Sequence, residues 1–366
     1  MKKLNLLSKS LFSATLLLGT TLTAYANDIT LVAGGGDGGD GSKATQAKLI
    51  EPFAVGFDAK NNLYIVEMEG GERLRKVDRN GILTTIAGTG EKGFSGDGGS
   101  AKKAQIQGSH HILVLPQGDV LIADTFNNRV RSLSAKTGII TTIVGTGDKG
   151  FSGEGGEATK AQFGGIYCLA LDAKSGSLYL CDLDNRRIRV LNKAKRVFTV
   201  AGNGKHGVPP DGSKATQSPL ADPRAIALDS KRNLYILERE GDALRVVTSD
   251  GKIRTLIGAP NHLLPDSIGA LKGPKHLCVD HQDNVIIADT ENNRILKYNP
   301  TTGDIQQIAG SGKTPPKGAS PTEDLSGSPL EINLNRPHGV FIHPDGSLYI
   351  ADSENGRVIR IQQKKG

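Results

Sequence analysis

Short apolar runs separated by polar turn clusters recur along the whole chain. The clearest run is rich in Leu, Ile, Val and Tyr, follows a cluster of turn residues and ends in a carboxylate, as in "NNLYIVE" at 61–67 and "GSLYIAD" at 346–352. It occurs six times, and the closing carboxylates are Glu67, Asp124, Asp182, Glu238, Asp289 and Asp352. Runs of this kind predict β-strands, and no segment shows a sustained helical period.

Each repeat unit contains four such runs. In the second unit they are "HHILVLP", "DVLIAD", "NRVRSLS" and "IITTIVG", between residues 110 and 145. The closing carboxylates of successive units lie 57, 58, 56, 51 and 63 residues apart. A repeat near 50 residues with four short strands is typical of a β-propeller. We therefore expect an all-β fold, a six-bladed β-propeller, as a single domain over 27–366. Its expected blades are approximately 51–88, 107–145, 163–202, 222–258, 273–310 and 336–366.

The two ends of the chain complete each other in this scheme. The sixth unit stops after "GRVIRIQQKKG" and has no fourth strand. The segment "DITLVAG" at 28–34 resembles the fourth strands "GILTTIAG" and "GIITTIVG" of other units. We expect 28–34 to supply the missing strand, which closes the ring and removes its open edges.

The units resemble NHL repeats. The resemblance is carried by Pro337-His338-Gly339-Val340 with "DGSLYIAD", by "DTFNNRVRSL" and "DTENNRILKY", and by "GILTTIAGTG". It covers essentially all of the chain after residue 26 and is similar in particular to the exported bacterial form with long glycine-rich loops. It implies a six-bladed propeller of NHL-type repeats, a fold that hosts binding proteins and enzymes alike.

The first 26 residues have the pattern of a secretory signal peptide. A basic start with three lysines is followed by an apolar stretch over 11–18 and by the small residues Ala24 and Ala26. This predicts cleavage after Ala26 and a periplasmic or secreted protein. The apolar stretch is too short for a membrane span, and no later segment approaches one.

The net charge of the chain limits the kinds of partner that we expect. Removal of the signal takes away three lysines and no acid, so the formal charge falls from +7 to +4. A net charge of +4 is too small to indicate nucleic-acid binding, and we expect a monomer whose partner is a small ligand or a protein.

We expect the three cysteines to be buried free thiols, although Cys168 and Cys181 could face each other across a hairpin.

Four glycine-rich loops separate the units, with acids at Asp40, Asp97, Glu154 and Asp211 spaced 57 residues apart. Gly88, Gly90 and Gly93 match the dinucleotide-binding spacing G-x-G-x-x-G. The strand, helix and parallel strand that such a site requires are absent from the pattern. One or two acids per loop are also few for calcium. We interpret these loops as connections between blades.

A mixed set of side chains follows the proline position of each unit. Because the first strand of a propeller blade lines the axis, these side chains should gather at one mouth of the channel, the default place for a ligand site. They are Phe53, His110, Tyr167, Arg224, Lys275 and His338.

The closing carboxylates should lie near the same mouth. In four blades an arginine follows five residues later, which predicts structural pairs across a tight turn: Asp124/Arg129, Asp182/Arg187, Asp289/Arg294 and Asp352/Arg357. Glu67 and Glu238, in the opposite blades 1 and 4, lack this arginine. They are candidates for ligand contact, with repeat drift as the alternative explanation.

The histidines offer a metal hypothesis. His110 and His338 occupy equivalent positions, and with Glu67 they could hold zinc or calcium. "RPHGV" resembles the Pro-His segment at the zinc site of peptidylglycine amidating lyases, and Glu67 can be compared with a glutamate of gluconolactonase-like propellers. We therefore expect a binding scaffold with its ligand or partner at the channel mouth. The alternative is a metal-dependent lyase or lactone hydrolase, in which the ion acts as a Lewis acid or generates hydroxide.

Overall fold

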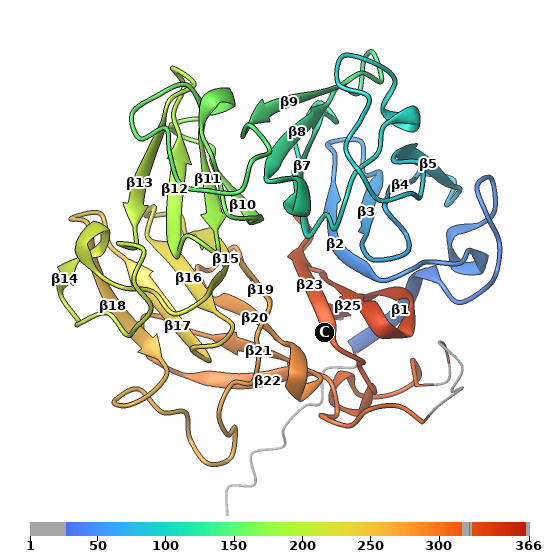
Figure 1. Ribbon diagram of the computed structural model, residues 1–366. Helices are drawn as coiled ribbons and strands as arrows, with labels where there is room; N and C mark the ends of the chain where they lie inside the picture. Colours follow the sequence, from blue (N-terminus) through green and yellow to red (C-terminus); the bar gives the residue numbers. More distant parts are fainter. Residues whose placement is uncertain (1–26, 317–321, 323, 364–366) are drawn as a thin grey trace, which may run out of the picture.

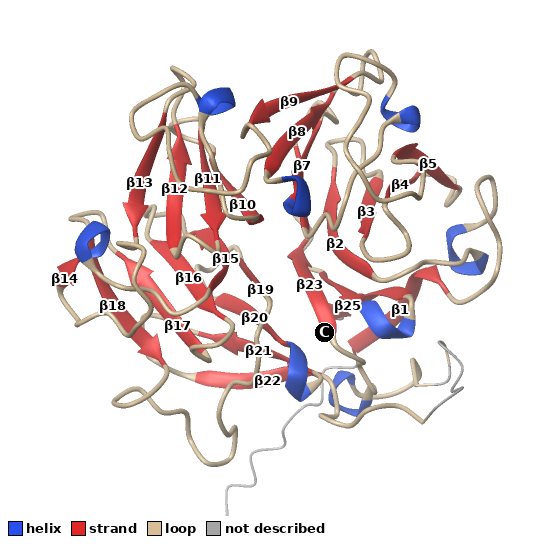
Figure 2. Cartoon of the chain, viewed as in Figure 1, coloured by secondary structure: helices blue, strands red, loops and turns tan. Residues whose placement is uncertain are grey.

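Six small antiparallel sheets form a closed ring in the computed structural model, which describes residues 27–316, 322 and 324–363 (Figures 1 and 2). The predicted signal peptide, 1–26, lies outside these residues. The all-β prediction and the number of blades are confirmed. Short 3-10 turns are the only helical elements among the described residues, and none of these could cross a membrane.

Each blade is an up-and-down meander whose first strand lies toward the centre of the ring (Figure 1). The strands of blades 1 to 3 are β2 (Pro52–Phe57), β3 (Leu63–Glu67), β4 (Arg73–Val77), β5 (Leu83–Ala87), β6 (His111–Val114), β7 (Val120–Asp124), β8 (Arg129–Leu133), β9 (Ile140–Val144), β10 (Ile166–Asp172), β11 (Ser177–Asp182), β12 (Arg187–Leu191) and β13 (Val197–Ala201). Those of blades 4 to 6 are β14 (Ser213–Lys214), β15 (Pro223–Leu228), β16 (Leu234–Glu238), β17 (Ala243–Val247), β18 (Lys252–Ile257), β19 (His276–Val279), β20 (Val285–Asp289), β21 (Arg294–Tyr298), β22 (Ile305–Ala309), β23 (Pro337–Ile342), β24 (Leu348–Asp352) and β25 (Arg357–Gln363).

The N-terminal strand completes the last blade. β1 (Asn27–Gly34) pairs antiparallel with β25, for example Ile29 with Ile361 and Leu31 with Ile359, so the sixth sheet has the order β1-β25-β24-β23. This confirms the closure predicted from "DITLVAG". The ring is therefore held by hydrogen bonds between the two ends of the chain.

The core lies between neighbouring blades. The second strand is buried on both faces in five blades, and in blade 3 only Ser177 and Tyr179 of β11 are partly exposed, which explains the uninterrupted apolar sequence of these strands. Its central residue has no exposed surface in any of the six blades: Ile65, Ile122, Leu180, Ile236, Ile287 and Ile350.

The glycine-rich loops begin where an outermost strand ends. Gly88, Gly145 and Gly202 have positive φ, and a Cβ at any of them would lie only 2.1–2.2 Å from a backbone carbonyl oxygen in the turn between the second and third strands of the same blade. Only glycine tolerates this approach. These glycines therefore serve chain packing, as expected for a connection between blades.

Candidate functional site

All six closing carboxylates are buried and have the same structural role. Each accepts a hydrogen bond of 2.7–2.9 Å from the backbone N–H that precedes the first strand of its own blade. In blade 2, for example, Gln107 N–H donates to Asp124. The six carboxylates have at most 1% exposed surface. They anchor the chain as it enters each blade.

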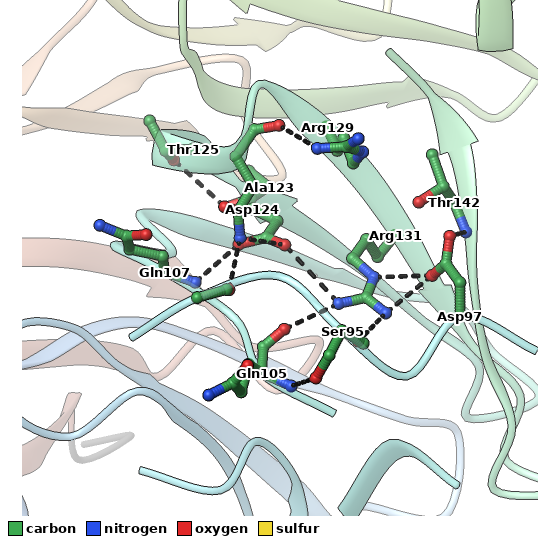
Figure 3. Close-up of polar contacts among 12 residues, drawn as sticks. Ser95, Asp97, Gln105, Gln107, Ala123, Asp124, Thr125, Arg129, Arg131 and Thr142 are labelled. Atoms are coloured by element: carbon green, nitrogen blue, oxygen red, sulfur yellow. Dashed lines mark hydrogen bonds and ion pairs between the residues drawn. The ribbon is translucent and has the colours of Figure 1, made fainter. Parts of the chain in front are cut away.

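The loop acids complete a clamp around a buried arginine. Figure 3 shows Arg131, with no exposed surface, between Asp124 and Asp97. Its guanidinium lies 2.7 Å from Asp97 and 3.8 Å from Asp124. Asp97 also accepts the backbone N–H of Thr142 on the outermost strand β9. The side chain of Arg131 thus connects the closing carboxylate Asp124 to the loop acid Asp97, which in turn is bonded to the outermost strand β9.

The same clamp recurs in blades 1, 3 and 6, and a variant of it occurs in blade 4. Arg75 bridges Glu67 and Asp40, and Arg189 lies 3.9 Å from both Asp182 and Glu154. Arg357 bridges Asp352 and Asp324. In blade 4 the arginine is Arg245, bonded to Glu238 and to Thr255, whose backbone N–H donates to Asp211. A repeated carboxylate–arginine–carboxylate contact explains the regular spacing of Asp40, Asp97 and Glu154.

Two of the four predicted carboxylate–arginine pairs form hydrogen bonds. Arg294 donates to Asp289, and Arg357 donates to Asp352, each at 2.7 Å. Arg129 and Arg187 do lie opposite Asp124 and Asp182 in register, but they turn outward. Arg129 donates to the carbonyls of Asn127 and Thr146 and stacks on Phe94. The prediction that these two arginines bind the carboxylates was wrong, because Arg131 and Arg189 fill that space.

Glu67 and Glu238 lack an arginine five residues later, as the sequence indicated, but each has an arginine partner further along the next strand. Arg75 donates to Glu67 at 3.1 Å, and Arg245 donates to Glu238 at 2.6 Å. Burial raises the pKa of both carboxyl groups, and the arginines oppose this shift. Both side chains are fully enclosed, so we withdraw them as candidates for ligand contact.

The six residues after the proline position do gather around the axis, and we call them the mouth ring. Phe53 stacks on His338 with centroids 3.9 Å apart and meets His110 edge-on at 5.1 Å. His110 contacts Tyr167 at 4.5 Å, and the guanidinium of Arg224 lies over the Tyr167 ring at 4.3 Å. Five blades thus contribute to one continuous series of side-chain contacts.

Lys275 completes the mouth ring from blade 5 and differs from Arg224 in its electrostatic environment. Its ammonium lies 2.8 Å from Glu291, which also binds Arg336. Arg224 is only 5% exposed, yet no nitrogen of its guanidinium donates a hydrogen bond to a described residue, and its Nε and Nη1 are fully covered. Burial lowers the pKa of Arg224 to about 10. The mouth ring therefore holds one buried cation that lacks a counter-ion among the described side chains.

One residue further along the first strands lies a second layer, the axial cluster, formed by His111, Cys168 and His276. His111 belongs to blade 2 and His276 to the opposite blade 5, and their ring centroids are 4.9 Å apart. Leu169 N–H donates to Nδ1 of His111, and Val340 N–H donates to Nδ1 of His276. Burial lowers the pKa of His111 to about 4 and holds the pKa of His276 well below its ordinary value. The axis is therefore occupied by two neutral imidazoles.

The metal set expected from the sequence is not assembled. Phe53 lies between His110 and His338, and Glu67 is enclosed with Arg75. Within the described chain, the three potential ligands that do converge, within 4.8 Å of one another, are His111, Cys168 and His276. The repeat pattern places His111 in blade 2 and His276 in blade 5. It does not reveal that these two side chains meet at the axis.

The thiols are free in the structure. Cys168 and Cys181 are buried, and Cys278 is partly buried. The hairpin register pairs Asp172 with Ser177 as expected, but an irregularity between Ile166 and Leu169 shifts Cys168 relative to its partner strand. Burial raises the pKa of Cys168 to about 11, so its sulfur is protonated at neutral pH.

Comparison with known protein families agrees with the repeat pattern. The Teneurin NHL domain matches residues 32–93 and 158–268, and the NHL repeat matches residues 334–361. Together these matches cover more than half of the chain.

Two relatives illustrate the range of proteins that contain similar segments. Protein SUPPRESSOR OF QUENCHING 1, chloroplastic, of Arabidopsis thaliana is 25% identical over 86% of this chain and 30% of its own length. NHL repeat-containing protein 2 of Bos taurus is 23% identical over 85% of this chain and 46% of its own length. The chain thus spans less than half the length of these curated relatives.

Solved structures share the fold. A protein of unknown function from Bacteroides thetaiotaomicron superimposes with a TM-score of 0.64 at 18% identity, over 92% of this chain and 76% of that chain. An auxiliary nutrient binding protein from Bacteroides ovatus gives 0.62 at 14% identity, over 93% and 78%. A putative gluconolactonase gives 0.57 at 11% identity, over 92% of both chains. At these identities the likeness is one of fold.

Proposed function

Because the chain is a six-bladed propeller of NHL repeats, we propose that it acts as an exported binding scaffold that takes its ligand at the mouth ring. The observation that carries the proposal is Arg224, a buried guanidinium without a hydrogen bond to any described residue. A buried charge is costly unless it is paired. A bound ligand that accepts hydrogen bonds from the guanidinium of Arg224 would offset this cost.

The composition of the mouth ring supports binding of a small molecule. Phe53, His110, Tyr167 and His338 provide aromatic faces, and Arg224 and Lys275 provide positive charge. Apolar and aromatic surfaces with a few converging polar groups are the usual composition of a ligand site. The similar fold of a solved auxiliary nutrient binding protein is consistent with this role.

The metal-dependent lyase or lactone hydrolase is less well supported. It depends on His110, His338 and Glu67 acting on one ion, and those side chains are separated by Phe53 or enclosed with Arg75. A binding role requires no such set.

A comparative ligand screen tests the proposal. Purified protein would be screened against a library of small metabolites by thermal shift, together with Phe53→Ala from the mouth ring and Phe198→Ala as control. Phe198 is 39% exposed and lies on β13, the outermost strand of blade 3, whereas the mouth ring lies at the innermost strands. We expect compounds that stabilise the parent and Phe198→Ala but not Phe53→Ala. Compounds that stabilise all three equally, or none, would contradict the proposal.

Export is tested separately. We expect protein recovered from the periplasm or the medium to begin at Asn27, because Ala24 and Ala26 match a signal-peptidase site. Protein that stays in the cytoplasm and keeps Met1 would contradict export without affecting the binding proposal.

A further inference from the structure

Some buried hydrogen-bond donors without a partner among the described residues lie in the channel. Nε and Nη1 of Arg224 are covered and donate to no described residue. Asp222 lies within electrostatic range of Arg224, but it is engaged with Arg239 at 2.7 Å. Glu291 is shared between Lys275 and Arg336. The positive charge of Arg224 therefore has no ion-pair partner among the residues that the structure describes.

The axial cluster adds donors of a different kind. Nδ1 of His111 accepts a backbone N–H at 3.3 Å, and Nδ1 of His276 accepts one at 3.2 Å. A neutral imidazole has a proton on one nitrogen only, so both rings must carry it on Nε2. Nε2 of His276 is buried and has no partner among the described residues. Arg224 and His276 thus leave guanidinium and imidazole N–H groups unpaired in the channel, among the residues that the structure describes.

The same hydrogen bonds disfavour a metal at the axial cluster. A metal-bound imidazole usually donates its other ring N–H to an acceptor. Here the other nitrogen of both rings faces a backbone donor, so binding through Nε2 would place two N–H groups against each other. Arg224 would add repulsion, since its positive charge acts on both His276 and Cys168. An acceptor with negative charge satisfies all of these groups.

We propose that the ligand of the mouth ring presents a carboxylate group, which accepts hydrogen bonds from the guanidinium of Arg224 and from imidazole N–H groups of the channel. This inference rests on the proposed function and narrows its ligand class. A planar carboxylate matches the guanidinium in geometry, and hydrogen bonds between ionised partners are the strong ones. One uncompensated cation matches one negative charge, which favours a monocarboxylate over a dianion. The aromatic faces of Phe53 and Tyr167 are available to the rest of the ligand.

Acetate and acetamide form a matched pair of probes, because they have nearly the same shape and only acetate is charged. Each would be titrated at constant ionic strength into the parent protein, Arg224→Gln and Arg129→Gln. Arg129 is the control, since it is a partly buried arginine that binds backbone carbonyls away from the channel. Thermal shift and calorimetry would measure binding.

We expect acetate to raise the Tm of the parent and of Arg129→Gln by a few degrees at saturation, whereas acetamide has no effect. Arg224→Gln should be folded, with no response to acetate. Equal responses to acetate and acetamide that Phe53→Ala abolishes would overturn the carboxylate inference and leave the proposed function standing. An acetate response that persists in Arg224→Gln would also overturn the inference. No response to either probe, together with a negative metabolite screen, would overturn both.

Discussion

His111 and His276 meet across the axis of the propeller with ring centroids 4.9 Å apart, although blades 2 and 5 lie on opposite sides of the ring. Each is fixed by a backbone N–H from the following blade. The environment that keeps both imidazoles buried therefore exists only when the six blades are assembled, so the protonation of the pair is coupled to folding.

This pair should make stability sensitive to mild acid. The pKa of His111 is about 4 in the folded protein, against an ordinary value of 6.5, because the ring is buried. Between pH 6.5 and 4 the unfolded chain binds a proton that the folded chain does not, so stability falls as the pH falls. Asp124 and Asp182 act in the opposite direction, since burial raises their pKa to about 6 and about 7.

A difference measurement isolates the histidine. The free energy of unfolding of His111→Asn, relative to that of the parent, should increase by roughly 2 kcal/mol when the pH is lowered from 7 to 5, because only the parent loses the stability that depends on His111. Urea unfolding at both pH values measures this, and the aspartates cancel in the comparison. A relative stability that does not change with pH would show that His111 is not buried in its neutral form.

The buried arginines should contribute far more to stability than their neighbours two residues earlier. Arg131→Met leaves Asp124 without its cation and breaks the contact to Asp97, so we expect a loss of about 3–5 kcal/mol in urea unfolding. Arg129→Met removes hydrogen bonds to backbone carbonyls and the contact with the exposed Phe94 ring, and should cost less than half as much. Equal losses would refute the clamp as a source of stability.

The N-terminal strand should be essential for folding. In the intact protein β25 pairs with β1 along its length, so deletion of Asp28 to Gly34 would expose this edge of β25. We expect the truncated protein to aggregate or to melt at a much lower temperature, whereas Thr30→Ser should behave like the parent. A truncated protein with an unchanged Tm would show that the ring does not depend on this closure.

Metal removal should have no effect on the channel. Because both axial imidazoles accept backbone N–H bonds through Nδ1, we expect the purified protein to contain no stoichiometric zinc and to keep its Tm in EDTA. Elemental analysis of the parent and of His276→Ala measures this. One zinc per chain that is lost in His276→Ala would contradict our account of the axial cluster.

Much of the architecture could be predicted from the chain because the same physical pattern repeats. Six apolar runs that end in a carboxylate give six buried second strands, and the resemblance of 28–34 to a fourth strand gives the closure. The positions of the mouth ring followed from the repeat as well, since Phe53 and its equivalents come directly after the proline position of each first strand.

The arginine partners were harder to predict because two arginines compete for each carboxylate. Arg129 lies directly opposite Asp124 in the ladder, but Arg131 is the one that turns inward. The sequence does contain a signal for this choice. Arg75, Arg131, Arg189 and Arg245 recur with nearly the same spacing as the loop acids Asp40, Asp97, Glu154 and Asp211.

The contact between His111 and His276 and the missing partner of Arg224 needed three-dimensional information. The first depends on which blades face each other across the axis, and the second on which acids are already engaged elsewhere, such as Asp222 with Arg239. Neither follows from the spacing of residues within one repeat.

The most direct test of a ligand-binding mouth is the stability of Arg224→Met without ligand, measured beside Arg245→Met from the same blade. Both arginines are buried, but Arg245 binds Glu238 and Thr255, whereas Arg224 has no hydrogen bond to a described residue. We predict that Arg245→Met loses about 3–5 kcal/mol, while Arg224→Met is as stable as the parent or more stable, because an unpaired charge has been removed. A loss in Arg224→Met as large as that in Arg245→Met would mean that Arg224 holds the fold together and would contradict its assignment to a ligand.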